Sequence, residues 1–108
     1  MSRIEQIARR RAGGSDHSLH HHAAIIIRKG RMLSAACNLG WIHAECRALK
    51  AASRRSLVGA IVYSFRFGKD GKMRLAKPCA NCQTAMEMAG IKRCYYSTTD
   101  GGIAVMEL

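Results

Sequence analysis

Two short segments, far apart in the sequence, constrain the fold of this chain more than any other feature. The first is His43-Ala44-Glu45 and the second is Lys77-Pro78-Cys79-Ala80-Asn81-Cys82. Cysteines three positions apart at the start of an apolar-periodic helix place both sulfurs on one side of its first turn, where free N–H groups and the helix dipole favour thiolates. Pro78 suits such a helix start because its φ is fixed and it has no N–H to satisfy. The two thiolates make half of a metal site, so the fold must bring a further ligand to them.

His43 is the best candidate for the third ligand. Imidazole and thiolates together suit Zn2+, and three protein ligands leave one position open for water. Residues two apart on an ideal helix point about 200° away from each other. His43 and Glu45 therefore converge on one site only if His43 is the non-helical cap of the helix predicted at 45–52. A carboxylate beside zinc-bound water can accept its proton and return it to a leaving group, which makes Glu45 the candidate catalytic residue.

Each part of this pattern also has a simpler explanation. A single Cys-x-x-Cys in a small intracellular chain is often redox-active or half of a zinc knuckle, and a single histidine on a helix is usually structural. The order of the parts, with Pro78 in place and a strand-like segment between the two halves, favours a catalytic zinc site. The rival is a structural zinc site, which leaves Glu45 without a task.

The size and hydropathy of the chain predict one soluble domain over residues 1–108, large enough for a single core. Apolar runs such as 23–27 are too short to span a bilayer, and the N-terminal segment lacks the apolar stretch of a signal peptide. We therefore expect a cytoplasmic protein with no membrane partner, in a host cytoplasm if the chain is phage-encoded. Cys37, Cys46 and Cys94 are then expected to be reduced core thiols. Cys46 follows Glu45 directly and could lie near the metal, but neighbouring residues of a helix point in different directions.

Charge is the strongest compositional feature. The 18 Lys and Arg residues outnumber the 7 Asp and Glu, which gives a formal net charge of +11. Such a field attracts phosphate-bearing ligands, either nucleotides or a polynucleotide backbone, in a salt-dependent way. Basic residues are spread along the chain, so a solvated basic surface is the simpler alternative.

Hydrophobic periodicity predicts an α/β fold with a mixed five-stranded sheet and about three helices. The predicted helices are 2–11, one that follows Glu45, and 79–89, and the predicted strands are 23–27, 32–38, 57–67, 91–99 and 103–108. Strand, helix and strand in succession suggest a parallel crossover. Strands 4 and 5 should instead be antiparallel, because the connection 100–102 is much shorter than the dozen or so residues of a crossover.

Two polar segments leave alternatives open. Residues 15–22 are predicted to form a loop with four histidines, which are more often polar residues near an entrance than a second metal site. The histidines are His17, His20, His21 and His22. Asn38 ends a strand shortly before His43 and could offer both functions of its amide to a ligand. It could equally be a turn residue before Gly40.

The order of these elements, with His-Ala-Glu and Pro-Cys-x-x-Cys opening two of the helices, resembles the cytidine deaminase superfamily over essentially the whole chain. Within it, the chain resembles the compact cytidine and deoxycytidylate deaminase-like zinc proteins of bacteriophages. The resemblance implies a three-layer sandwich, with His43, Cys79 and Cys82 as the Zn2+ ligands and Glu45 as the proton shuttle. Asn38 would contact the sugar hydroxyl of the substrate. Ala44 and the backbone around Pro78 and Cys79 would hold the reacting groups.

The activity implied by this resemblance is hydrolytic conversion of cytosine to uracil in a free nucleoside or nucleotide, of the deoxycytidylate or cytidine type. The antiparallel end of the sheet resembles nucleoside deaminases and toxin-type deaminases. It argues against the tRNA adenosine and APOBEC branches, whose fifth strand runs parallel. One alternative is a deaminase of single-stranded DNA or RNA, which the basic charge would also serve. Another is a zinc-stabilised, non-catalytic binding module. Because so small a domain leaves faces poorly covered, and by analogy with the family, we expect a homo-oligomer.

Overall fold

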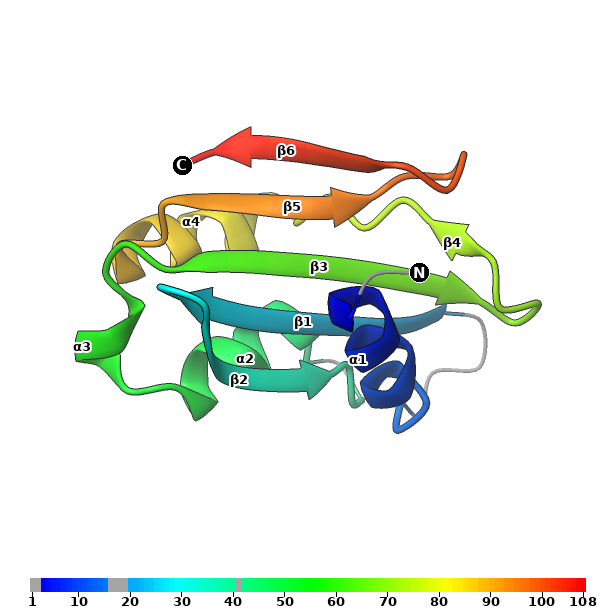
Figure 1. The fold of residues 1–108 in the computed structure, drawn as a ribbon, viewed down its shortest axis with the longest axis horizontal. Coiled ribbons are helices and arrows are strands. Elements are labelled where there is room, and N and C mark those ends of the chain that lie inside the picture. Colours follow the sequence, from blue (N-terminus) through cyan, green and yellow to red (C-terminus); the bar gives the residue numbers. More distant parts are fainter. Residues whose placement is uncertain (1–2, 16–19, 41) are drawn as a thin grey trace.

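The computed structural model describes residues 3–15, 20–40 and 42–108, arranged as a mixed sheet between layers of helices (Figure 1). The predicted start of the first helix at Ser2, and His17, lie outside the described residues. The helices are α1 (Arg3–Ala12), α2 (Ala44–Ala51), α3 (Arg54–Leu57) and α4 (Ala80–Ala89). The strands are β1 (His20–Arg28), β2 (Arg31–Cys37), β3 (Ile61–Gly68), β4 (Met73–Arg74), β5 (Arg93–Ser97) and β6 (Ile103–Glu107).

The sheet has the order β2-β1-β3-β5-β6. β1 is antiparallel to both β2 and β3, whereas β3 and β5 are parallel. β5 and β6 are antiparallel, as the short connection predicted. The prediction of a mixed sheet is therefore confirmed. A sixth strand, β4, was not predicted: it has only two residues, which return beside Arg66 and Phe67 after a tight turn and pair with β3.

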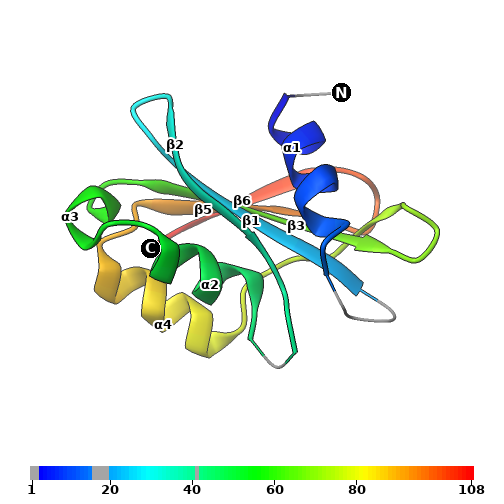
Figure 2. The same ribbon diagram turned by 90° about the horizontal axis from the view of Figure 1, so that it is seen from below.

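Helices cover both faces of the sheet, which confirms the three-layer sandwich (Figure 2). α1 lies against one face, and α2 and α4 lie side by side against the other. The side chains of β1 divide between the two layers because successive residues of a strand point to opposite faces. Ala24 and Ile26 pack in the cluster on the side of α2 and α4, and Ala23 and Ile25 in the cluster on the side of α1.

Two boundaries differ from the predictions. His20–His22 are not in a loop: β1 begins at His20 and pairs with β3 from His20 opposite Gly68 to Ile27 opposite Ile61. Backbone pairing with a long partner strand outweighs the polarity of the histidines. Leu57 is not in a strand but ends α3, and β3 begins only at Ile61.

The helices of this fold are short. Among the residues that the structure describes, none forms a helix long and apolar enough to cross a membrane.

Candidate metal centre and catalytic site

The two predicted half-sites meet at the beginnings of α2 and α4. β2 and β3 run in the same direction because each is antiparallel to β1. Both strands therefore end at the same edge of the sheet. The chain enters α2 after β2, and it enters α4 after β3 and the short strand β4. His43 is the N-cap of α2 and Cys79 is the N-cap of α4, both with extended backbone angles. His43 thus has the non-helical position that its convergence with Glu45 required.

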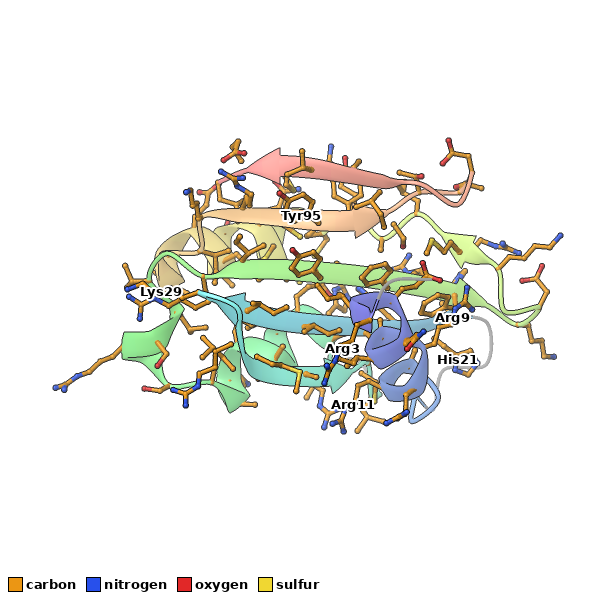
Figure 3. The ribbon with its side chains drawn as sticks, in the orientation of Figure 1. Arg3, Arg9, Arg11, His21, Lys29 and Tyr95 are labelled. Atoms are coloured by element: carbon orange, nitrogen blue, oxygen red, sulfur yellow. The ribbon has the colours of Figure 1, made fainter. Side chains whose placement is uncertain are left out.

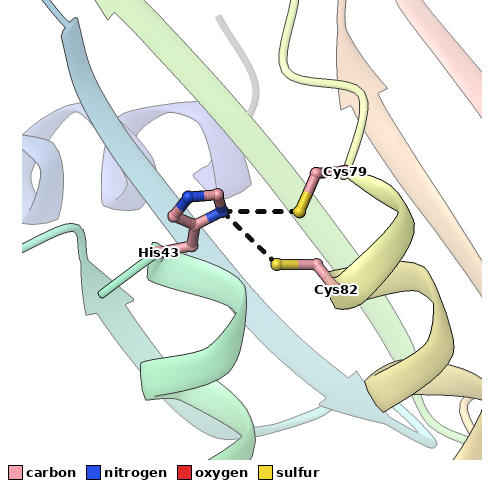
Figure 4. A group of neighbouring side chains, drawn as sticks. All are labelled: His43, Cys79 and Cys82. Carbon is pink, nitrogen blue, oxygen red and sulfur yellow. Dashed lines mark hydrogen bonds between the residues drawn. The ribbon is translucent and has the colours of Figure 1, made fainter. Parts of the chain in front are cut away.

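The three predicted ligands lie within reach of one metal ion (Figure 4). Nδ1 of His43 is 3.7 Å from Sγ of Cys79 and 3.4 Å from Sγ of Cys82, and all three ligand atoms lie within 4.8 Å of one another. Zn–N bonds of about 2.05 Å and Zn–S bonds of about 2.3 Å at tetrahedral angles separate nitrogen and sulfur by about 3.6 Å. The donor set and its spacing therefore fit zinc, with His43 binding through Nδ1.

Cys82 lies deeper than the other two ligands. His43 and Cys79 are exposed, whereas Cys82 is buried. Burial, followed by the negative charge of Glu45, raises the pKa of the Cys82 thiol. A divalent cation reverses this preference, because a coordinating thiol is deprotonated. The buried thiol is therefore suited to a metal and poorly suited to act as a free thiolate.

Glu45, in the first turn of α2, is buried, with 2% of its surface exposed. Burial raises the pKa of its carboxyl above the ordinary value, while a hydrogen bond from its own backbone and the nearby His43 and Arg66 oppose this increase. Its Oε1 atom has no hydrogen-bond partner among the described residues. A buried carboxylate oxygen normally has a partner, and a water held between Glu45 and a metal ion would supply one. This orphaned oxygen is the second observation that fits a zinc centre.

A buried polar group that the sequence analysis missed lies next to Glu45. Nε2 of His22 is 3.3 Å from Oε1 of Glu45 and 2.7 Å from Oγ of Ser64. Ser64 donates a hydrogen bond of 3.0 Å to the carbonyl oxygen of Ala76. Burial, and then the positive charges of Arg66, His43 and His20, lower the pKa of His22 to about 3. In a strand, the spacing His20-x-His22 would have placed both side chains on one face of the sheet. This signal could be used only if the segment had been predicted as a strand.

Asn38 is one of the predicted substrate contacts, and its side chain is hydrogen-bonded to the protein. Asn38 binds the backbone of β1 with both ends of its amide: Oδ1 accepts from N–H of His22 at 3.0 Å, and Nδ2 donates to the carbonyl of His20 at 3.3 Å. Oδ1 keeps a second lone pair and Nδ2 a second hydrogen, so contact with a substrate hydroxyl stays a prediction.

Ala44 and Pro78 frame the two helix starts. Ala44 is the first residue of α2 and is buried. Pro78 precedes the N-cap Cys79 and thus lies two residues before Ala80, where α4 begins, rather than in the first turn as predicted. Its carbonyl oxygen accepts a hydrogen bond of 2.8 Å from Nε2 of Gln83. Their contact with substrate also stays a prediction.

All five cysteines lie in described residues, and none forms a disulfide. Cys37 and Cys94 are buried, as expected of reduced core thiols. Cys46 is closer to the metal ligands than its place in the sequence indicated, because its Sγ lies 3.6 Å from Sγ of Cys82.

The fold and the site define a zinc-binding α/β domain in which a buried carboxylate lies beside a His-Cys-Cys centre. Residues 1–98 match the model of the cytidine and deoxycytidylate deaminase zinc-binding region, and the chain belongs to this family. Membership in the cytidine deaminase superfamily and the use of zinc are therefore confirmed. The chain carries a zinc-dependent deaminase domain. That residues 1–108 form a single domain stays a prediction.

Solved structures show the same fold at low sequence identity. The apo dCMP deaminase from the cyanophage S-TIM5 matches with a TM-score of 0.60 and 22% identity, over 94% of this chain and 89% of that one. RibD from Acinetobacter baumannii matches in form 1 with a TM-score of 0.66 and 19% identity, over 86% of this chain and 26% of that one. Its form 2 matches with a TM-score of 0.64 and 16% identity, over 88% of this chain and 27% of that one. The chain thus spans about a quarter of the RibD chains. A search of curated proteins found no match.

Proposed function

We propose that this protein is a zinc-dependent hydrolase that converts cytosine to uracil in a free nucleoside or nucleotide, with Glu45 as its catalytic residue. The observation that carries the proposal is the buried Glu45 carboxylate, with an orphaned oxygen, in the first turn of the helix that His43 caps beside Cys79 and Cys82. A structural zinc site is normally closed by four protein ligands and gives no reason to bury a carboxylate beside three.

In the proposed reaction, water adds to C4 of cytosine and ammonia leaves. Zinc held by His43, Cys79 and Cys82 would supply a Lewis acid that lowers the pKa of a bound water. Glu45 accepts a proton from the attacking water and delivers it to ring nitrogen N3. It then moves the second proton of that water, from the new hydroxyl on C4, to the amine, so that the C4–N bond breaks, ammonia leaves and the C4 carbonyl of uracil forms. The raised pKa of Glu45 suits this role, because a group that both accepts and returns protons works best when its pKa is near the working pH.

Among free substrates we favour a nucleotide such as deoxycytidylate. The net charge of +11 attracts phosphate, and the same charge would serve a single-stranded nucleic acid. The similar fold of a cyanophage dCMP deaminase supports the mononucleotide, at the level of fold only. Five unpaired cysteines, two of them proposed as zinc ligands, suit a reducing cytoplasm, which would be that of a host if the chain is phage-encoded.

We also propose that the protein forms a homo-oligomer. A groove of about 740 Å³ lies between α2, α3 and α4 and is lined mostly by apolar side chains. Met88 and Val58 at this groove are 84% and 60% exposed, and exposed apolar patches of this kind commonly form protein interfaces. The molecular mass in solution at micromolar concentration tests this. A dimer or larger species is expected, and a monomer contradicts the proposal.

The proposed reaction is tested by measuring uracil and ammonia release from dCMP, deoxycytidine, cytidine and a single-stranded oligonucleotide that contains cytosine. The matched control is Glu45→Gln, which keeps the size of the side chain but cannot accept the proton. We expect turnover of dCMP, and a loss of about 10²- to 10⁴-fold in kcat for the variant, with zinc content unchanged. Turnover of the oligonucleotide alone would indicate a polynucleotide deaminase. Zinc-loaded protein that is inactive on all four substrates would favour the binding module.

A further inference from the structure

Polar side chains on the face of the sheet below α2 gather where the sheet meets Glu45. Ala24 and Val62, further along β1 and β3, are apolar members of the core on this face. His22 and Ser64 occupy the same face and are also fully buried, with 3% and 0% of their surfaces exposed. Burial of two polar side chains in one place is costly unless they bind each other or a third group. Here they bind each other, and Glu45 is the charged group beside them.

The hydrogen bonds of Ser64 determine which nitrogen of His22 carries the proton. The single hydroxyl hydrogen of Ser64 points to the carbonyl oxygen of Ala76. Oγ of Ser64 must therefore accept from His22 over the 2.7 Å between them, so Nε2 of His22 is protonated. A pKa of about 3 keeps the ring neutral near pH 7, and this tautomer is the neutral one. The donor N–H lies on the nitrogen that is 3.3 Å from Oε1 of Glu45.

The backbone around His22 fixes the position of the ring. Both backbone groups of His22 bind Asn38: its N–H donates to Oδ1 at 3.0 Å, and its carbonyl accepts from N–H of Asn38 at 3.1 Å. On its other side, His22 is paired with Arg66 of β3. The central position of β1 between β2 and β3 therefore holds the imidazole in place below the carboxylate.

We propose that His22 is a positioning residue for Glu45, and that Ser64 sets the tautomer that makes this possible. The proposal rests on the proposed role of Glu45 in proton transfer. The Nε2–H group of His22 donates to Ser64, and its nitrogen lies 3.3 Å from Oε1 of Glu45 without a hydrogen bond to it. This close polar contact restrains Oε1 in the direction from which a proton is accepted and returned. A rigid, uncharged polar neighbour restrains the carboxylate without neutralising it. Misplacing a catalytic group by about 1 Å can cost about 10²-fold in rate.

The test compares two replacements of His22 in the zinc-loaded protein. His22→Gln can place an amide N–H near the position of Nε2, whereas His22→Leu fills space without a donor. We expect His22→Leu to lower kcat for dCMP by about 10- to 100-fold with KM changed less than about threefold, and His22→Gln to recover at least a third of the wild-type kcat. His21→Leu, one residue away on the opposite face, is the matched control and should leave kcat unchanged.

Ser64→Ala extends the test to the tautomer. Alone it should lower kcat by about 3- to 10-fold, and it should add nothing when combined with His22→Leu, since residues that act through one group are not additive. Zinc content and melting temperature, measured on every variant, show whether it has folded. Folded, zinc-loaded His22→Leu with wild-type kcat overturns the proposal. A His22→Gln variant as slow as His22→Leu also overturns it, because the imidazole would then do more than donate.

A spectroscopic measurement separates this proposal from the proposed function. Nitrogen-15 spectra of histidine-labelled protein should show His22 as the neutral ring protonated at Nε2, with a resonance that shifts in Glu45→Gln. A ring protonated at Nδ1 overturns the positioning role even in an active enzyme. Conversely, zinc-loaded wild-type protein without turnover of any cytosine substrate overturns the proposed function, and the positioning role with it, even where the spectrum shows the contact.

Discussion

The two faces of the sheet are built from the same strands but have different contents. The face toward α2 and α4 carries His22 and Ser64 at one end and an apolar cluster around Val62 along its length. The face toward α1 carries an apolar cluster that includes Phe65 and Phe67. Figure 3 shows Arg9 of α1 and His21 of β1 on this second side. The comparison indicates that the α1 face contributes stability, while the end of the opposite face near the helix starts contributes chemistry.

Removing a metal ligand should have the largest effect, and it should abolish the chemistry of the site without affecting the core on the α1 face. Cys82→Ser should lose zinc and all measurable deaminase activity, because a hydroxyl is a poor replacement for a thiolate in a zinc site. Cys46→Ser is the matched control, since its sulfur lies 3.6 Å from that of Cys82 but outside the His43 triad. Bound zinc and uracil release measure both. Equal loss of zinc from Cys46→Ser would make Cys46 a fourth ligand.

Shortening a core side chain on the α1 face should give the opposite result, a loss of stability with activity retained. Phe65 is buried and lies beside Phe67, with ring centroids 6.3 Å apart. Phe65→Ala should lower the free energy of unfolding by about 3–5 kcal/mol, as large-to-small core changes do. Urea denaturation measures this loss. The kcat per folded, zinc-loaded molecule should stay within about twofold of wild type, and a kcat that falls with stability would show that the two faces are not independent.

Acid should destabilise the folded protein through His22, which lies on the face toward α2. Its folded pKa of about 3 lies below the ordinary value of 6.5, so the unfolded chain takes up a proton first as the pH falls. The stability contributed by the neutral ring is present above pH 6.5 and is lost progressively between pH 6.5 and 3. At pH 5 the loss is about 2 kcal/mol relative to the plateau at higher pH. Urea denaturation of His22→Gln at the same zinc concentration should lack this component, and an identical pH dependence in both proteins would contradict the assignment.

The smallest effect is expected for the polar contacts of Arg9, which connect α1 to the sheet and to the turn at Gly71. The guanidinium of Arg9 lies 4.4 Å from the centre of the Phe67 ring, and its Nη1 donates a hydrogen bond of 2.7 Å to the carbonyl of Gly71. Arg9→Ala should cost about 1 kcal/mol of stability, because both interactions are partly exposed to water. Arg10→Ala, on the same helix and exposed, is the control. A thermal melt of each variant measures the difference, and equal melting temperatures would show that the tie contributes nothing.

The parts of the fold and site that could be predicted follow from short stretches of the sequence. The cysteine spacing, Pro78, and the short connection before Ile103 each fix a nearby geometry, and they led to the helix start, the ligand set and the antiparallel end of the sheet. The requirement that His43 cap its helix came from helix geometry alone. The structure has that cap.

The parts that could not be predicted depend on partners far along the chain. His22 is polar and follows two other histidines, which is typical of a loop. It is buried only because β3 pairs with β1, and because Ser64, 42 residues later, accepts a hydrogen bond from its ring. Nor could local chemistry show that the amide of Asn38 binds the backbone of β1.

The short distance between Cys46 and Cys82 has a consequence for handling the protein. Their sulfurs are 3.6 Å apart, and a disulfide bond of about 2.05 Å requires only a small movement of two side chains. Once metal has been removed with a chelator, air oxidation can join a zinc ligand to its neighbour, and the oxidised chain cannot be reloaded. The number of free thiols, titrated in denaturant, would fall from five to three per chain. Metal-free preparations should therefore be kept under a reductant, and aged samples should recover their zinc capacity when a reductant is added.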